Sequence, residues 1–474
     1  MNRRLFLSAS IASALGLTAC GGSSDNNNGN GNGEETNFTR LFQIPAELQG
    51  SINNGRVQYD LTLQTGTSQF IDSTNTPTWG VNGDYLGPTI RLKNGSKVDI
   101  HFQNNLPEET TMHGHGMHLP AEMDGGVHQV IPAGQKWTSS YTVNQHASTN
   151  WYHPHLMGKT AEHVINGLAG LIIIDDDNSE RLDLPKRYGV DDIPVIIQDR
   201  SFNSDGSFNY NPDRREIMQG WKGDTYLVNG IIKPYLDLEA KQIRFRILNA
   251  SNSRIYRFGF TSGRSFKQIA TDNSFLESPV DLSQLVLSPA ERAEIVVDFS
   301  ADKGKTDIFK DMAGSAELFK VNINQNATAT TMLPDHLINL PRLDPSDATN
   351  TRSFTLSGRR GQLLINGQSM DKNVINESIS VNTTEIWEVT NVMPMDHNFH
   401  IHATHFQLLE RNGSANNVAA NEKGYKDTVY IPPSESVKFI VKMTDYTSST
   451  KPYMYHCHIL EHEDAGMMGQ FVVV

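Results

Sequence analysis

Four short motifs in the chain place two histidines one residue apart: "HGH" (His113, His115), "HPH" (His153, His155), "HIH" (His400, His402) and "HCH" (His456, His458). Random placement of 17 histidines in 474 residues would give about 0.6 such pairs. On a β-strand, residues i and i+2 face the same side, so each pair presents two imidazoles together. A single pair is typical of a surface or a core, but four pairs predict a metal cluster built from both ends of the chain. Neutral imidazole is a good ligand for copper.

Cys457 lies between the two histidines of the last pair. On a strand its thiol would point away from both imidazoles, so thiolate and imidazoles would serve two metals through adjacent residues. His397 is three and five residues from His400 and His402, and by the same parity it can join Cys457.

A second histidine and a methionine follow the cysteine. His462 and Met467 come five and ten residues after Cys457, with Gly466 allowing the loop to turn. One Cys, two His and a distant Met are the ligands of a blue-copper electron-transfer site. Met468 is the alternative to Met467, and an isolated Met in this position would ordinarily be a core residue.

The length and charge of the chain limit its organisation and its partners. A chain of 474 residues is long enough for two to four domains. The chain has 40 Lys and Arg against 53 Asp and Glu with no basic stripe, which argues against binding of nucleic acid or anionic lipid. We expect a monomer.

The first 38 residues differ in composition from the rest. Residues 1–20, "MNRRLFLSASIASALGLTAC", have the charge and apolar pattern of an export signal, and Arg3 and Arg4 resemble a twin-arginine signal. "LTAC" resembles a lipoprotein cleavage box, which would leave Cys20 lipidated as a membrane anchor; the alternative is an ordinary signal that is cleaved off. Residues 21–38 are polar and predict a flexible tether. The expected location is periplasmic, either free or anchored as a lipoprotein.

The body of the chain predicts an all-β fold. Short stretches rich in β-branched and aromatic residues alternate with Gly, Asn and Pro turns, as in "TIRLKNGSKVDIHFQNN" and "TTEIWEVTNV". Breaks near residues 175–187 and 333–352 divide it into three β-sandwiches, at 39–180, 181–340 and 341–474. The middle piece has no His or Cys between Val164 and Asp335, so the metal ligands must come from the outer two.

These motifs resemble those of the multicopper oxidases, in the branch of bacterial copper-efflux oxidases, bilirubin oxidases and laccase-like enzymes. The resemblance covers nearly the whole body and includes "TTMHGHG", "NWYHPHLMGKT", "HNFHIHATHFQLL" and "HCHILEHEDAGMM". It implies three cupredoxin-like Greek-key sandwiches and four copper ions, one blue and three in a cluster between domains 1 and 3. Gly114 departs from the family, where an aromatic residue often separates the first two histidines.

The resemblance also implies which residue binds which copper. Cys457, His397, His462 and axial Met467 would hold the blue copper. In the cluster, one copper would take His113 and His400. The coupled pair would take His115, His153 and His458 on one ion, and His155, His402 and His456 on the other.

The same resemblance implies a reaction. One-electron oxidation of a donor at the blue site would be coupled to four-electron reduction of O2 to water. Asp124 and Glu463 are similar to the family's acidic proton relays, although each taken alone would be read as an exposed carboxylate.

The donor is the least determined part. Copper-efflux oxidases carry a Met-rich insertion over the blue site, whereas the 15 methionines here do not cluster before domain 3. We therefore predict laccase-like oxidation of phenols and related aromatic donors, with Cu(I) oxidation as the alternative because Met393, Met395 and Asp396 flank His397. A copper-free scaffold of this fold and a copper nitrite reductase fit less well, because every ligand position is filled and the chain has four His-X-His pairs.

Overall fold

The computed structural model describes residues 38–474 except 315, 330 and 360. The predicted export signal and the tether up to residue 37 lie outside the described residues. Residues 38–474 form one compact unit in which strands far outnumber helices, which confirms the all-β fold class. No helix among these residues is both long enough and apolar enough to cross a membrane.

Two sheets make up the first sandwich. One sheet has the strand order β1 (Glu47–Leu48), β5 (Thr89–Lys93), β10 (Gly170–Asp175), β9 (Ser148–His153) and β7 (His113–His115). The other has β2 (Ser51–Asn53), β3 (Arg56–Ser68), β6 (Lys97–Asn104) and β8 (Lys136–Thr142), with β4 (Thr76–Val81) paired to β3. Leu61 and Leu63 from one sheet and Ile172 and Ile174 from the other share one buried core.

The middle sandwich also has two sheets. One runs β13 (Ile231–Ile232), β12 (Thr225–Val228), β11 (Asp192–Arg200), β15 (Gln242–Asn249), β20 (Arg292–Asp298), β17 (Phe266–Ala270) and β18 (Phe275–Leu282). The other runs β14 (Tyr235–Glu239), β22 (Glu317–Gln325), β21 (Thr306–Asp311), β16 (Tyr256–Phe260) and β19 (Leu285–Leu287). Phenylalanines dominate the core between them.

The third sandwich repeats this plan. Its first sheet is β24 (Gln362–Ile365), β23 (Ala348–Arg359), β26 (Thr384–Asn391), β30 (Ser436–Lys442) and β28 (Phe406–Arg411). Its second is β25 (Glu377–Ile379), β32 (Met468–Val473), β31 (Ser448–His456), β27 (His397–Ile401) and β29 (Thr428–Ile431). In β26 every second residue is fully buried, so Trp387 and Val389 face the core while the residues between them are only partly buried.

Short helices connect the strands. They are η1 (Ala121–Met123), α1 (Thr160–Asn166), α2 (Asp177–Arg181), α3 (Arg214–Gln219), η2 (Pro345–Asp347), η3 (Ala415–Asn417), η4 (Ala420–Glu422) and α4 (Leu460–Asp464). The predicted domain boundaries at 180/181 and 340/341 fall between the strands of successive sandwiches and stay predictions.

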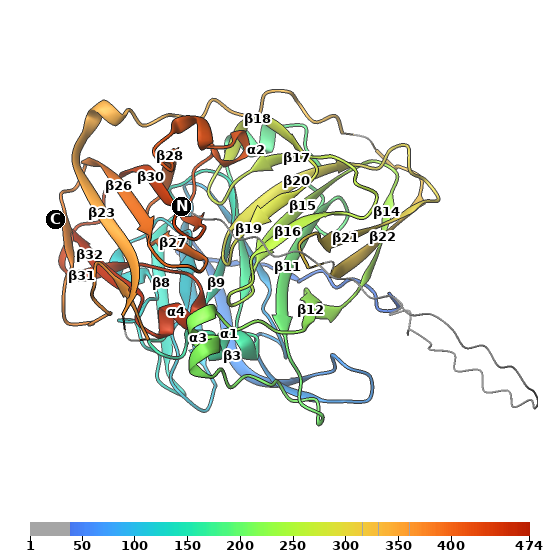
Figure 1. The fold of residues 1–474 in the computed structure, drawn as a ribbon. Coiled ribbons are helices and arrows are strands. Elements are labelled where there is room, and N and C mark those ends of the chain that lie inside the picture. The colour runs from blue at the N-terminus through green and yellow to red at the C-terminus, as the bar shows by residue number, and fades with distance from the viewer. Residues whose placement is uncertain (1–37, 315, 330, 360) are drawn as a thin grey trace, which may run out of the picture. The chain divides into compact units, whose positions relative to one another are not determined.

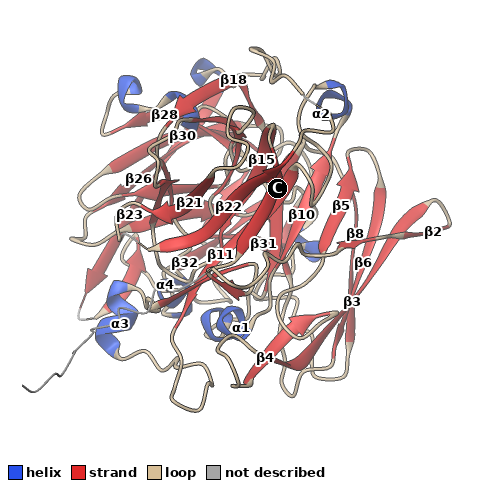
Figure 2. Ribbon diagram, turned by 90° about the vertical axis from the view of Figure 1, so that its right-hand side faces the viewer, coloured by secondary structure: helices blue, strands red, loops and turns tan. Residues whose placement is uncertain are grey.

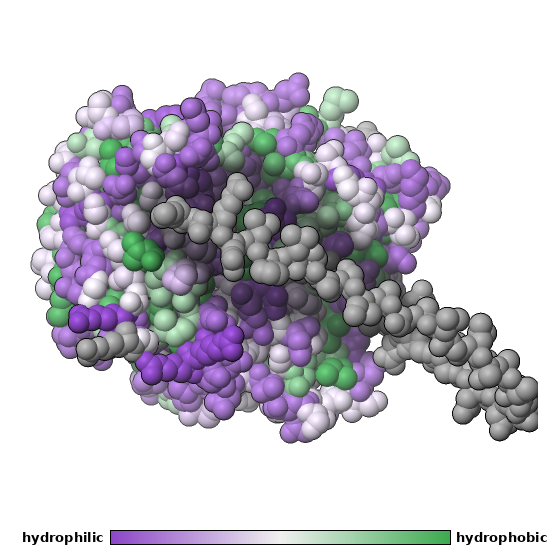
Figure 3. Space-filling model, viewed as in Figure 1, coloured by the Kyte–Doolittle hydropathy of each residue, from purple (hydrophilic) through white to green (hydrophobic). Residues whose placement is uncertain are grey.

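The first and third sandwiches adjoin one another. In Figure 1, the cyan strands of the first sandwich adjoin the orange and red strands of the third, and Figure 2 shows the strands stacked in layers. The face in Figure 3 is mainly hydrophilic, and its apolar residues are scattered. Scattered surface apolar residues are normal for a folded protein.

Candidate metal centre

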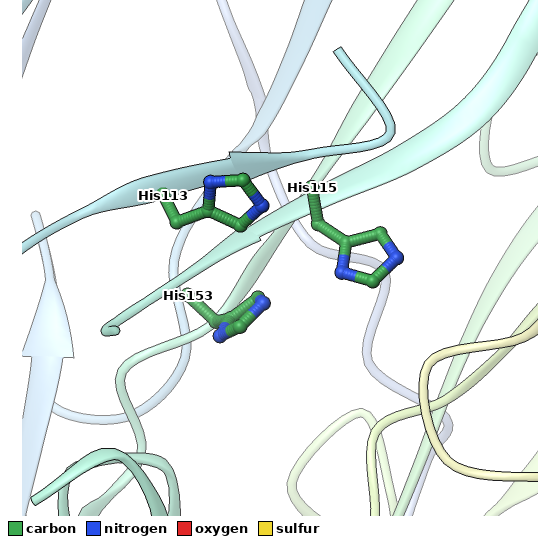
Figure 4. Close-up of side chains that lie close together, drawn as sticks. All are labelled: His113, His115 and His153. Carbon is green, nitrogen blue, oxygen red and sulfur yellow. The ribbon is translucent and has the colours of Figure 1, made fainter. Parts of the chain in front are cut away.

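The eight paired histidines are brought together between the first and third sandwiches. β7 and β9 are antiparallel neighbours with His113 opposite His153, as Figure 4 shows, and β27 and β31 place His400 opposite His456. The other four are His115 at the end of β7 and His155, His402 and His458 just beyond strand ends. All eight imidazoles are at most 1% exposed.

Rings from the two sandwiches interleave. His115 stacks on His400 with 3.8 Å between ring centroids, and His113 stacks on His402 at 4.0 Å. The Nε2 atoms of His155 and His402 lie 3.2 and 3.1 Å from that of His456. The trio of His155, His402 and His456 is the same as one of the ligand sets implied by the resemblance. In a second implied set, Nε2 of His153 lies 3.4 Å from Nε2 of His458. The division of the eight among individual coppers stays a prediction.

The ring nitrogens of this cluster fit a metal. The buried atoms His113 Nε2, His115 Nδ1, His400 Nε2 and His458 Nδ1 have no hydrogen-bond partner. Unpaired buried polar atoms are costly and are rare without an unseen partner such as an ion. Two of these same rings are held by donation from Nδ1, His113 to the Asp124 carbonyl at 2.7 Å and His400 to the Asp427 carbonyl at 2.9 Å. The hydrogen bonds thus leave Nε2 of these two rings free for copper.

Burial keeps the imidazoles neutral. It lowers the pKa of His113, His115 and His153 well below 6.5, and neighbouring imidazoles lower these values further. Burial also lowers the pKa of His155, to about 4. Neutral imidazole is the form that binds a metal.

A second group lies around Cys457, on the other side of the chain from His456 and His458. The Cys457 Sγ is 3.4 Å from His397 Nδ1 and 3.6 Å from His462 Nδ1, and all three residues are fully buried. This placement follows the strand parity expected from the sequence. Burial raises the pKa of the thiol to about 12, so copper must displace its proton.

The structure separates the two candidate axial methionines. Met467 belongs to the same buried cluster as Cys457, and its backbone bonds to both Cys457 and His462. Met468 instead packs with Met370, Met454 and Val127 in a separate cluster. The geometry favours Met467 beside the cysteine.

The two predicted relay acids are buried and lie next to different imidazoles. His402 Nδ1 donates to Asp124 Oδ2 at 2.8 Å, while Asp124 Oδ1 has no partner. Glu463 Oε1 and Oε2 lie 3.4 and 3.3 Å from Nδ1 of His155 and His456, with no hydrogen bond. Burial raises the pKa of both carboxyls, and Asp464 raises that of Glu463 further. Neither acid is exposed, and both are placed where a proton could pass to the cluster.

Sequence reasoning missed a third acid, Asp427. Its Oδ1 accepts from His115 Nε2 at 2.9 Å, and its carbonyl accepts from His400. Arg292 of the middle sandwich binds both carboxylate oxygens at 2.8 and 2.7 Å. Burial alone would raise the pKa of Asp427, but Arg292 and His115 hold it well below its usual value. The only feature of the sequence that could have indicated Asp427 is its position directly before β29, the strand that pairs with β27.

Histidines outside the two groups make other contacts. His118 donates to Asp445 at 2.6 Å, His163 to Glu108 at 2.8 Å and His405 to the Gly116 carbonyl at 3.0 Å. His128 bonds Gln470 and His101 bonds Thr138. None of these belongs to a metal-binding group among the described residues.

The buried imidazoles predict acid lability of the copper-free protein. Above pH 6.5 both folded and unfolded chains hold neutral histidine. Below it the unfolded chain takes up protons that the folded one excludes, which costs about 1.4 kcal/mol per pH unit for each such histidine. For His155 and His397, whose folded pKa is about 4, this loss continues to about pH 4. Asp124 and Glu463 have raised pKa values in the folded chain, so they bind protons there before they do in the unfolded chain. Their protonation offsets part of the loss of stability as the pH falls.

We expect the melting temperature of the copper-free protein to fall steeply between pH 6.5 and 4.5, as measured by circular dichroism. His155→Gln should make the fall shallower, and His336→Gln, outside the site, should leave it unchanged. A melting temperature independent of pH would contradict the prediction.

Known proteins share this arrangement. Residues 62–179 and 339–474 match two family models that are both described as multicopper oxidase. The multicopper oxidase mco of Staphylococcus haemolyticus is 39% identical over 429 residues, which is 89% of each chain. The chain belongs to the multicopper oxidase family. Membership of this family implies that this oxidase binds copper, and the two histidine groups are residues that could hold it.

Other relatives differ in what their names state. The cell division protein FtsP of Xenorhabdus nematophila is 34% identical to this oxidase over 436 residues, covering 87% and 88% of the two chains. A laccase from Pediococcus acidilactici has the same fold with a TM-score of 0.86 and 36% identity over 92% and 94% of the chains. A laccase-like multicopper oxidase, CueO, from Ochrobactrum sp. has a TM-score of 0.86 and 34% identity over 91% and 100% of the chains. That enzyme is described as having oxidase activity towards lignin model compounds and lignosulfonate.

Proposed function

We propose that this multicopper oxidase takes single electrons from phenolic or related aromatic donors and uses them to reduce O2 to water. The observation that carries the proposal is the pair of buried sites joined through one tripeptide. Cys457 lies with His397 and His462, while His456 and His458 on either side of it belong to the eight-histidine group. Four bound coppers would supply the four one-electron steps that O2 reduction requires.

The chain's own residues prepare each part of this reaction. Cys457, His397, His462 and Met467 would hold the copper that receives the electron, and the short covalent path from Cys457 to its neighbouring histidines leads to the cluster. Asp124 and Glu463 hold protons at raised pKa beside His402, His155 and His456. Full burial of the site keeps bulk water away from the reacting oxygen.

The aromatic donor class rests on two observations. None of the helices described in the third sandwich is rich in methionine, unlike the Met-rich insertion over the blue site of copper-efflux oxidases. Relatives with the same fold include a laccase and an oxidase that acts on lignin model compounds. We also propose that the protein acts after export, in the periplasm or as a lipoprotein held at Cys20.

Oxygen consumption by the copper-loaded protein tests this function. We expect O2 uptake with a dimethoxyphenol or a phenylenediamine, four donor molecules being oxidised for each O2. Uptake with Cu(I) and with none of several phenols and diamines would overturn the aromatic donor class.

Cu(I) is the second candidate donor because sulfur lies next to the blue site. Met393 Sδ is 3.2 Å from His397 Nε2, and Met218 and Met395 pack against the same core. Thioethers are soft ligands that suit Cu(I). The copper-free scaffold has less support, because the ten histidines predicted as ligands and Cys457 are all buried in two groups.

A further inference from the structure

Two motifs of the chain each end in a histidine that is not a predicted copper ligand. "HGHGMH" (113–118) and "HIHATH" (400–405) share the pattern His-X-His-X-X-His, and the first two histidines of each belong to the eight-histidine group. The third is His118 in the first motif and His405 in the second. Neither belongs to a metal-binding group among the described residues. The first and third sandwiches therefore each carry one extra imidazole, three residues beyond a predicted ligand.

These two extra histidines exchange hydrogen bonds across the boundary between the sandwiches. His118 Nδ1 donates to the carbonyl of Ala403 at 2.7 Å, and Ala403 directly follows the second histidine of its motif. In the opposite direction, His405 Nε2 donates to the carbonyl of Gly116 at 3.0 Å, and Gly116 has the same position in the other motif. Each bond thus holds the residue that follows a predicted ligand of the opposite sandwich.

Both acceptor residues have a left-handed backbone, with φ of 78° at Gly116 and 59° at Ala403. This conformation suits glycine but is uncommon for alanine, and it persists only where the surroundings hold it. The Gly116 carbonyl also accepts from Gln145 at 2.9 Å and from Asn273 at 3.1 Å. Among the described residues, only His118 bonds the Ala403 carbonyl. The bond from His118 therefore matters more for the backbone that it holds.

His118 is fixed by a second bond and is charged. Its Nε2 donates to Asp445 Oδ1 at 2.6 Å, and the Thr444 hydroxyl donates to the same oxygen at 3.2 Å. The bond from His118 lowers the pKa of Asp445, so this carboxyl is ionised. Because carbonyl and carboxylate oxygens only accept, both ring nitrogens of His118 carry hydrogen. His405 is neutral by contrast, because burial lowers its pKa to about 4.

We propose that His118 and His405 are positioning residues that clasp the first and third sandwiches together and so hold His115 and His402 in place for copper. The eight-histidine group takes ligands from both sandwiches, and ligands bind a metal well only when neighbouring groups fix their geometry. The clasp supplies this by fixing the backbone directly beside one ligand of each sandwich. The inference goes beyond the proposed function, because it holds whichever donor the oxidase uses.

Competition with a chelator, followed by metal analysis, tests the clasp. His118→Gln removes a charged hydrogen bond, so we expect copper in the eight-histidine group to bind about tenfold more weakly. His405→Gln should weaken it only about threefold, because other side chains still hold the Gly116 carbonyl. The blue absorption band should stay in both variants, since Cys457 lies outside the clasp. His118→Lys keeps the charge and should recover much of the affinity.

Asp445→Asn is a milder change to the same bond. It removes the charge that His118 meets but leaves an oxygen that accepts, so copper should bind about threefold more weakly. This variant also decides the question if His118→Gln does not fold.

His128→Gln is the matched control. His128 Nε2 donates to Gln470 Oε1 at 2.8 Å and so also joins the first and third sandwiches, but neither residue lies beside a predicted ligand. We expect a lower melting temperature with unchanged copper affinity.

Normal copper affinity in His118→Gln and Asp445→Asn, or an equal loss in His128→Gln, would reduce the clasp to an ordinary contact between sandwiches and overturn the proposal. No recovery in His118→Lys would overturn the part played by the charge. A wild-type protein whose eight-histidine group holds no copper would overturn the clasp as well. Failure to oxidise any aromatic donor would instead overturn only the proposed function, because the affinity is measured without a donor.

Discussion

Cys457→Ser is expected to abolish the absorption band near 600 nm and reduce O2 consumption to background for every donor. The band arises from thiolate bound to copper. In the structure Cys457 is the only described cysteine, and its Sγ is the atom that His397 and His462 surround. Serine has a similar size, but its hydroxyl is a poor ligand for this copper. The blue site would then hold no copper to accept the electron from the donor.

The eight-histidine group should survive this change because its ligands face the other side of the chain. We therefore expect the loss of one copper per chain, measured by metal analysis, with the remainder retained. Met468→Leu is the control, since Met468 packs in a separate cluster and should leave the band intact. Met467→Leu should keep the colour but shift the potential. A blue Cys457→Ser protein would show that the thiolate is not the ligand.

Asp427→Asn is expected to lower the free energy of unfolding by up to about 3–5 kcal/mol, the cost of breaking a buried ion pair, because Arg292 would keep only the more distant carboxylate of Asp272 at 3.8 Å. It should also weaken copper binding by about 10–100-fold, as loss of a hydrogen bond behind a metal ligand does. The two effects share one cause, because the same carboxylate binds Arg292 and orients His115. Urea unfolding and a competition titration with a chelator measure them separately.

A buried pair outside the metal centre separates stability from copper affinity. Asp192 accepts two bonds from Arg246, at 2.7 and 2.9 Å, and is fully buried. Asp192→Asn should therefore destabilise the protein, although by less because Arg246 keeps its ion pair with Glu294 at 2.8 Å, while leaving its copper affinity unchanged. If Asp427→Asn behaved in the same way, with normal copper affinity, Asp427 would have no role at the metal.

The sequence predicted what depends on local period and residue type. Strand parity placed Cys457 opposite His456 and His458, and it did so because extended backbone fixes the direction of each side chain. The four paired motifs likewise identified the buried histidines. The all-β class followed from short β-branched runs separated by turns.

Contacts between distant segments were not predictable in this way. Arg292 and Asp427 are 135 residues apart, and nothing in either local sequence links them. Glu461 looked like one acid in a polar "LEHED" run, yet the fold buries it against Tyr210 and Trp221. Burial likewise made Asp124 and Glu463 different from the exposed carboxylates that each would suggest alone.

The division of the ligands between both ends of the chain has a consequence for biosynthesis. His113 to His155 leave the ribosome long before His397 to His462 are made. At about 5–20 residues per second the interval is roughly 10 to 50 seconds. During that time the first imidazoles have no partners from the third sandwich and could capture stray metal ions in the wrong geometry. Correct metallation is therefore a late event, and the finished fold, not the nascent chain, selects copper.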